Sequence, residues 1–138
     1  MPDLHSAAGA TYVCQLLICA LLAILFLQSG IDKIIDRRGN LDWLTGHFAK
    51  SPLAGMVPVL LLVLTLLELA AGALAAVGGV IVAIGGDTTL AFYGAVLAGV
   101  TLVALFFGQR MAKDYPGAAS LVPYFLVAIA GIYLLARP

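Results

Sequence analysis

From Gly55 to Val77 the sequence reads GMVPVLLLVLTLLELAAGALAAV, a run in which Glu68 is the one charged residue. A helix that crosses the hydrocarbon core of a bilayer needs about 20 predominantly apolar residues, and this run supplies them. Its Leu and Val residues are continuous, whereas a strand of a membrane β-barrel alternates apolar and polar residues. The run therefore predicts a transmembrane helix.

Three further intervals of the chain lack charged residues over a similar length. They contain 28 residues between Asp3 and Asp32, 22 between Asp87 and Arg110, and 22 between Asp114 and Arg137. Each interval is long enough for one span. We therefore predict an all-α integral membrane protein, a bundle of four transmembrane helices at residues 12–31, 55–77, 90–108 and 118–135.

The composition supports this fold class and excludes others. Hydrophobic residues make up 63% of the chain and charged residues 10%, whereas a soluble domain carries about 25% charged residues. Seven basic residues balance seven acidic residues, so no net positive charge favours nucleic acid as a partner. No repeat is visible, and residues 1–138 are predicted to form a single membrane domain. The first apolar run follows Asp3 and no basic residue, which is unlike a secretory signal peptide.

The distribution of basic residues predicts the orientation. Six of the seven fall in the two connectors at residues 32–50 and 109–117, namely Lys33, Arg37, Arg38, Lys50, Arg110 and Lys113. Short loops rich in Lys and Arg face the cytoplasm. We therefore predict that both connectors are cytoplasmic and that both termini lie outside.

The first connector is predicted to contain a short helix between the first two spans. Asn40 can cap its start, and Pro52 stops it. Leu41, Leu44 and Phe48 fall on one face, which is typical of a helix lying in the headgroup layer. The alternative is a surface loop that packs these residues on the bundle.

Small residues predict which helix faces meet, because close approach of helices in lipid depends on them. The small-xxx-small pairs are Ala71 with Ala75, Gly72 with Ala76, and Ala95 with Gly99. These pairs indicate tight packing of the second and third spans.

Glu68 is the first candidate functional residue. A carboxylate near the centre of the bilayer costs about 2.5–3.5 kcal/mol on insertion scales, so Glu68 should face the bundle interior, be protonated, or both. Counting inward from the cytoplasmic ends places Thr101 at a similar depth, which makes Thr101 the expected partner. Glu68 either handles a proton or a ligand, or only ties two helices together.

Polar residues at the cytoplasmic rim form a second candidate site. Gln28 and Asp32 share one face of the first span, and Lys33 follows them. Gln109, Arg110, Lys113 and Asp114 close the third span, and Tyr124 enters from the fourth at about the depth of Gln28. Together these eight residues are predicted to line a polar pocket for a quinone head group, a lipid or a loop of a partner. The alternative is that the basic residues pair with lipid phosphates.

The cysteines and histidines do not form a recognisable cofactor site. Cys14 and Cys19 lie about 140° apart around the first predicted helix, so they cannot bridge each other, and no Cys-x-x-Cys is present. This pattern argues against a thiol oxidase. His5 and His47 are far apart in the predicted topology, which argues against a haem or zinc site.

Four short motifs, in order along the chain, resemble the DoxX-like family of bacterial membrane proteins. They are Phe26-Leu27-Gln28-Ser29-Gly30-Ile31-Asp32-Lys33, Leu41-Asp42-Trp43-Leu44, Leu67-Glu68-Leu69-Ala70-Ala71-Gly72 and the tail around Gln109-Arg110. The resemblance places Gly30, Lys33 and Glu68 in the shared motif. It implies a four-helix bundle in the bacterial cytoplasmic (inner) membrane.

For some relatives the resemblance also implies an association with redox systems, including the membrane subunit of thiosulfate:quinone oxidoreductase. We therefore expect a small integral subunit of a redox-associated membrane complex that anchors a partner and borders a quinone site. Glu68 would take a proton there, and Lys33 or Arg110 would hold the head group. The chain itself is expected to bind no cofactor, and its partners are the lipid bilayer and other membrane or redox subunits.

Two alternatives remain open. The run of small residues and the scarcity of polar side chains also suit a structural or assembly subunit that fills a groove between larger membrane proteins. A small proton-coupled transporter would share the single membrane carboxyl. Such transporters carry it in the first helix and have short connectors, whereas Glu68 lies in the second span.

Overall fold

The computed structural model describes residues 3–137 and confirms an all-α fold with four helices long and apolar enough to cross a membrane. The elements are α1 (Ala7–Ile35), α2 (Arg37–His47), a 3-10 turn η1 (Ala54–Met56), α3 (Val57–Ala83), α4 (Thr89–Met111), α5 (Tyr115–Ser120) and α6 (Val122–Leu135). The first span is α1, and the second consists of η1 and α3. The third span is α4, and the fourth consists of α5 and α6.

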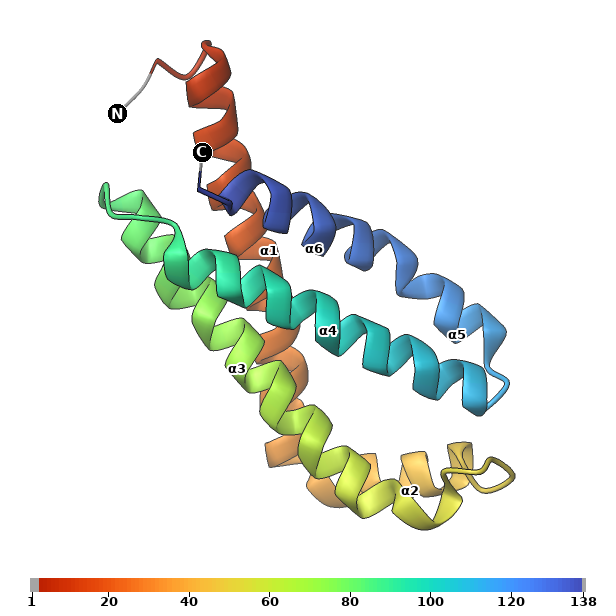
Figure 1. Cartoon of the computed structure of the whole chain (residues 1–138). Helices are drawn as coiled ribbons and strands as arrows, with labels where there is room; N and C mark the ends of the chain where they lie inside the picture. The colour runs from red at the N-terminus through yellow and green to blue at the C-terminus, as the bar shows by residue number, and fades with distance from the viewer. Residues whose placement is uncertain (1–2, 138) are drawn as a thin grey trace.

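The long helices pack in a closed order, in which α1 contacts α3, α3 contacts α4, α4 contacts α6, and α6 returns to α1 (Figure 1). The contact between α1 and α6 lies near the termini, where a Cβ on Gly131 would be 2.9 Å from Ile18 Cγ2. Toward the other end α1 and α5 diverge (Figure 1). The bundle is therefore tighter at the end that carries the termini.

The spans extend beyond the predicted boundaries, because apolarity marks the hydrocarbon crossing and a helix continues until its backbone is capped. α1 begins at Ala7, where the Ser6 hydroxyl accepts a hydrogen bond from Gly9 N at 3.0 Å. The fourth span, predicted to be continuous over residues 118–135, is divided between α5 and α6 at Leu121. Pro123 explains the break, because proline has no N–H for the helical hydrogen bond and clashes with the preceding turn.

The short helix between the first two spans is present, and Figure 1 shows α2 lying across one end of the bundle. Its predicted start was wrong, because Asp36 rather than Asn40 is the N-cap and accepts from Gly39 N at 3.2 Å. The Asn40 side chain instead donates to the Asp36 carbonyl at 2.8 Å. The helix ends at His47, before Pro52.

Small residues lie at close helix contacts, as predicted for α3 and α4, but Gly72 packs on α1 rather than on α4. A Cβ on Gly72 would lie 2.8 Å from Leu27 N of α1, and a Cβ on Gly94 would lie 2.8 Å from Ala75 N. Both distances are to backbone atoms, so only glycine permits these approaches. Ala71, Ala75 and Ala95 are buried in the same interfaces.

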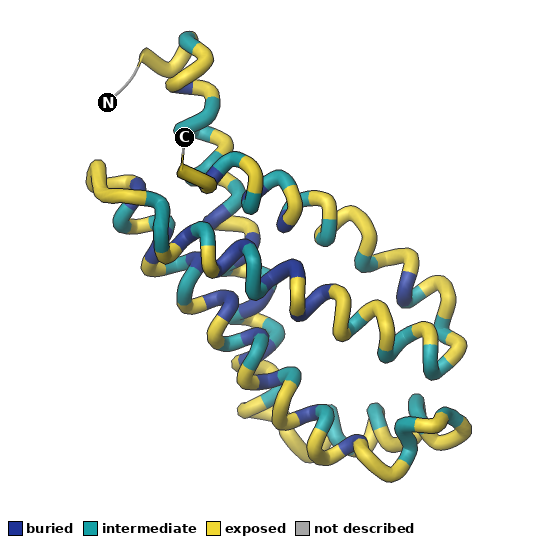
Figure 2. Tube along the Cα trace, viewed as in Figure 1, coloured by how far each residue is buried: buried dark blue, intermediate teal, exposed yellow. Residues whose placement is uncertain are grey.

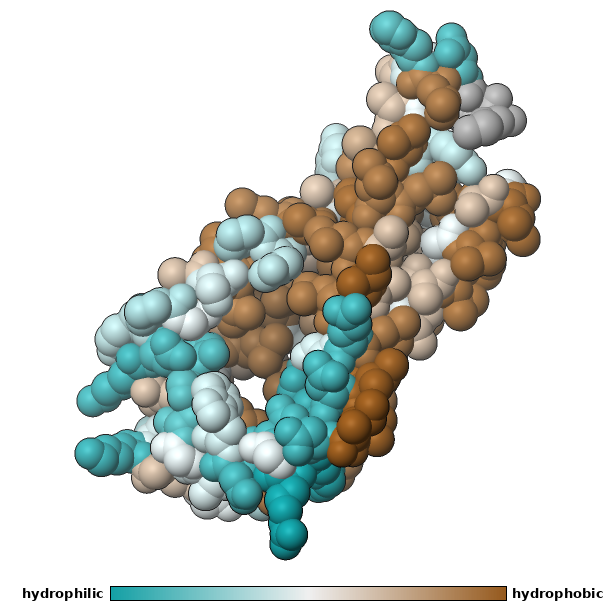
Figure 3. All heavy atoms as spheres, turned by 180° about the vertical axis from the view of Figure 1, so that it is seen from behind, coloured by the Kyte–Doolittle hydropathy of each residue, from teal (hydrophilic) through white to brown (hydrophobic). Residues whose placement is uncertain are grey.

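The buried residues lie on the facing sides of the helices, and the outward faces are exposed (Figure 2). Many of the exposed residues are large and apolar, such as Leu66 and Val80 at 60% and 61% exposed. Figure 3 shows that apolar atoms cover the middle of the visible face and that polar atoms gather at its ends. This distribution is that of a multi-pass protein surrounded by lipid.

The end that carries the termini is closed by side chains that bind the last carbonyls of α3 and α6, which have no partner within their own helices. Tyr12 donates to the Ala83 carbonyl at 3.2 Å, Gln15 to Leu134 at 2.8 Å, and Thr88 to Leu135 at 2.7 Å. Both charged connectors lie at the opposite end, where α2 contacts the segment between α4 and α5.

Candidate functional site

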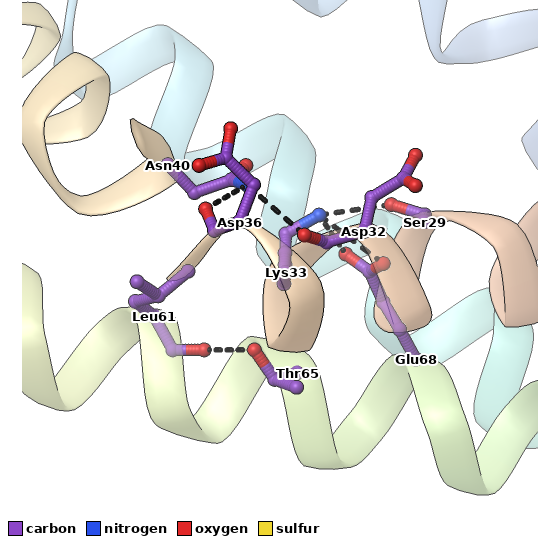
Figure 4. A network of polar contacts seen from close by, with 8 residues as sticks. All are labelled: Ser29, Asp32, Lys33, Asp36, Asn40, Leu61, Thr65 and Glu68. Atoms are coloured by element: carbon purple, nitrogen blue, oxygen red, sulfur yellow. Dashed lines mark hydrogen bonds and ion pairs between the residues drawn. The ribbon is translucent and has the colours of Figure 1, made fainter. Parts of the chain in front are cut away.

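Glu68 forms an ion pair with Lys33 between α3 and α1 (Figure 4). The Lys33 ammonium lies 3.1 Å from Oε1 of Glu68 and donates to Oε2 at 3.3 Å. It also donates to the Ser29 hydroxyl at 2.8 Å. Glu68 is 1% exposed and the Lys33 side chain 13% exposed. The acidic group therefore faces the bundle interior, as its cost in lipid requires.

Two features of the sequence place this pair. Ser29 and Lys33 are four residues apart, so they lie on the same face of α1. Gly30 lies between them, and a Cβ there would lie 2.7 Å from Leu69 Cδ2 and 3.3 Å from Leu69 N. The absence of a side chain at Gly30 thus brings α1 against α3 beside Glu68.

The expected partner of Glu68, Thr101, has a different role. Its hydroxyl is buried and donates to the Leu97 carbonyl of its own helix at 2.7 Å. Thr65, one turn from Glu68 on α3, donates in the same way to Leu61 at 2.7 Å. The partner of Glu68 is Lys33 and not Thr101. The prediction compared only the depths of residues along their helices, and it did not consider that a long side chain from another depth can reach Glu68.

Four other residues of the predicted rim pocket make no polar side-chain contact with one another among the described residues. Gln28, Asp32, Arg110 and Tyr124 are all exposed. Arg110 instead lies over the ring of Tyr115, with its Cζ 4.8 Å from the centroid.

A cavity of about 240 Å³ lies beneath α2, between α3 and α4. Its walls include Leu44 and Phe48 of α2, Leu60 and Leu64 of α3, and Leu105 and Gln109 of α4. Except for Gln109, these side chains are apolar, so the cavity suits an apolar molecule with a small polar group. Leu64 lies one helical turn from Glu68, about 6 Å along the axis of α3.

His47, at the end of α2, contacts α4 and the connector after it beside this cavity. Its Nε2 lies 2.8 Å from Oε1 of Gln109 and 3.5 Å from Oδ2 of Asp114. Trp43, one turn earlier, stacks on the His47 ring at a centroid distance of 4.5 Å. Gln109 and Asp114 were predicted at this rim, but their contact with His47 was not, because His47 and Gln109 are 62 residues apart and no local pattern links them.

Comparisons with protein-family models, with curated proteins and with solved structures find no match for this chain. The DoxX-like resemblance therefore remains a prediction based on its short motifs. The four apolar spans, the Lys33–Glu68 pair and the cavity beneath α2 are the features from which a function must be argued.

Proposed function

We propose that this protein is a small integral membrane subunit of a redox-associated complex and that it borders a quinone site in the cavity beneath α2. The cavity carries the proposal. A dry apolar cavity of about 150 Å³ can hold a benzene molecule, so 240 Å³ provides room for a quinone ring and the first carbons of its tail.

The surroundings of the cavity suit an amphiphile of this kind. Val63 and Phe107 line it and are also 47% and 56% exposed on the apolar outside of the bundle. A tail can therefore extend from the cavity into lipid. Gln109 supplies a polar contact for the ring, as small-molecule sites usually combine apolar walls with a few polar groups.

The resemblance to DoxX-like proteins supports the redox association. We propose that electrons reach the quinone from a partner subunit. The charged end formed by α2 and the connector between α4 and α5 lies beside the cavity, so we place the anchoring of the partner there.

Filling the cavity tests the proposal. The complex is purified in mild detergent with its native partners, which mass spectrometry identifies, and is labelled with a photoreactive quinone. Ala104 lines the cavity, and we expect Ala104→Phe to reduce both labelling and quinone-linked turnover several-fold. Ala73→Phe is the matched control, because Ala73 is exposed on α3 and does not line the cavity. Equal labelling of the two variants would contradict the proposed site.

Glu68 retains its predicted role as a proton-handling group in this proposal. It lies one turn from the cavity wall at Leu64, and Lys33 holds it. Glu68→Gln removes the ionisable group with little change of shape. Unchanged quinone-linked turnover in that variant would exclude proton handling by Glu68.

The ion pair also favours a second candidate function, that of a structural or assembly subunit. Lys33 and Glu68 join α1 to α3, which is what a purely architectural pair would do. This function predicts a stoichiometric complex whose activity, measured per assembled complex, survives replacement of Glu68, Lys33 or Arg110 by Ala.

A further inference from the structure

The orientation of the Gln109 amide is determined by its neighbours. Gln109 lines the cavity, and its Oε1 lies 2.8 Å from Nε2 of His47. The same Nε2 lies 3.5 Å from Oδ2 of Asp114. An amide oxygen can only accept a hydrogen bond, so Nε2 of His47 is the donor in its 2.8 Å contact with Gln109.

The carbonyl oxygen of Gln109 is therefore engaged by His47. The amide nitrogen then points away from His47 with two hydrogens to donate. Within the described part of the chain, no hydrogen bond from this nitrogen to another residue is found. A free donor is therefore available on a residue that lines the cavity, whose other walls are apolar apart from the indole N–H of Trp43.

Asp114 is itself held in place. Its Oδ1 accepts from Gly117 N at 2.9 Å, as the N-cap of α5. This contact leaves Oδ2 to face His47. Asp114, held by α5, thus lies beside the His47 ring that engages the Gln109 carbonyl oxygen.

We infer that Gln109 donates a hydrogen bond to a carbonyl oxygen of the molecule in the cavity, with His47 and Asp114 as positioning residues. The inference rests on the proposed quinone site and assigns its specificity. The site selects an amphiphile whose head carries an acceptor, and a ring of the same size without a carbonyl loses this contact.

Asp114→Asn tests the positioning role. The Asn oxygen remains at the cap of α5, so the amide nitrogen replaces Oδ2 and faces His47. We expect Nε2 of His47 to become an acceptor in this variant and the Gln109 amide to turn its carbonyl toward the cavity. Gln109→Leu removes the donor directly. Asp87→Asn is the matched control, because Asp87 also accepts from a backbone N–H at a helix start, Thr89 N at 3.2 Å, at the opposite end of the bundle.

Trp43 provides the measurement, because it is the single tryptophan of the chain and lines the cavity. Quenching of its fluorescence by a short-chain benzoquinone gives the affinity of the full-length protein in detergent. A benzene with the same chain and no carbonyls is then titrated as a competitor. A neutral hydrogen bond contributes about 0.5–1.5 kcal/mol, so we expect quinone affinity to fall about five-fold in Gln109→Leu and in Asp114→Asn.

Three further results are expected. Asp87→Asn has the same quinone affinity as the unmodified protein. The double variant Gln109→Leu with Asp114→Asn binds quinone no more weakly than Gln109→Leu alone, because both changes remove the same interaction. The carbonyl-free competitor binds all variants with equal affinity. The last result also shows that the cavity is intact in each variant. Equal quinone affinity in all variants would overturn the inference and leave the quinone site standing. Loss in Gln109→Leu alone would overturn the positioning role of Asp114. A protein that binds no quinone would overturn both the inference and the proposed function.

Discussion

Replacing Lys33 by Met tests the ion pair between α1 and α3. The substitution keeps most of the side-chain length and removes the ammonium that lies 3.1 Å and 3.3 Å from the two oxygens of Glu68. Glu68 is 1% exposed and would lose its charged partner. Breaking a buried pair from one side costs about 3–5 kcal/mol, and we expect a loss of unfolding free energy in this range.

The double variant Lys33→Met with Glu68→Leu distinguishes the pair from its parts. Well-packed apolar residues can replace a buried pair with little cost or with a gain. We therefore expect the double variant to be within about 1 kcal/mol of the original protein, so that the two changes are strongly non-additive. Lys50→Met is the control, because Lys50 is exposed on the same side of the molecule and forms no ion pair among the described residues.

Reversible unfolding in mixed micelles, followed by circular dichroism, gives the four free energies of this cycle. Additive losses in the two single variants would show that Lys33 and Glu68 do not depend on each other. A loss below about 1 kcal/mol in Lys33→Met, the range of an exposed pair, would show that the carboxylate finds another partner. Either result would refute the argument from burial.

The remaining predictions concern packing and accessibility. Gly72→Ala places a Cβ 2.8 Å from Leu27 N, and we expect micelle unfolding to show a loss of about 1–3 kcal/mol; Gly55→Ala, where nothing lies within 4 Å, should show none. Pro123→Ala restores a helical N–H donor, so hydrogen exchange should show a protected amide at residue 123 and a continuous fourth span; an unprotected amide would mean that another contact causes the break. N-Ethylmaleimide in detergent should modify Cys14, which is exposed, well before Cys19, which is 3% exposed; equal rates by mass spectrometry would contradict the packing of α1.

The fold could be predicted because its signal is local. The charge-free intervals identify four spans, and the small residues identify the faces that meet. Helix ends were less accurate because they depend on individual capping contacts. Asn40 and Asp36 are both capable caps, and only the backbone geometry selects Asp36.

The candidate site could be predicted only in part. The inward position of Glu68 follows from the cost of a carboxylate in lipid, which needs no knowledge of neighbouring helices. Its partner depends on the register of α1 against α3, which Gly30 and Gly72 determine through contacts with Leu69 and Leu27. The cluster of His47, Gln109 and Asp114 likewise requires α2 to fold back onto a connector far along the chain.

The separation of Lys33 and Glu68 along the chain bears on how the protein enters the membrane. Synthesis proceeds from the N-terminus, so α1 is made before α3. Lys33 lies two residues from the end of α1, where a long basic side chain can extend to the membrane surface. When α3 later leaves the insertion machinery, the Lys33 ammonium is already in the membrane and can pair with the Glu68 carboxylate. The order of the two residues thus allows an apolar helix that carries a carboxylate to be delivered into lipid as one half of a hairpin.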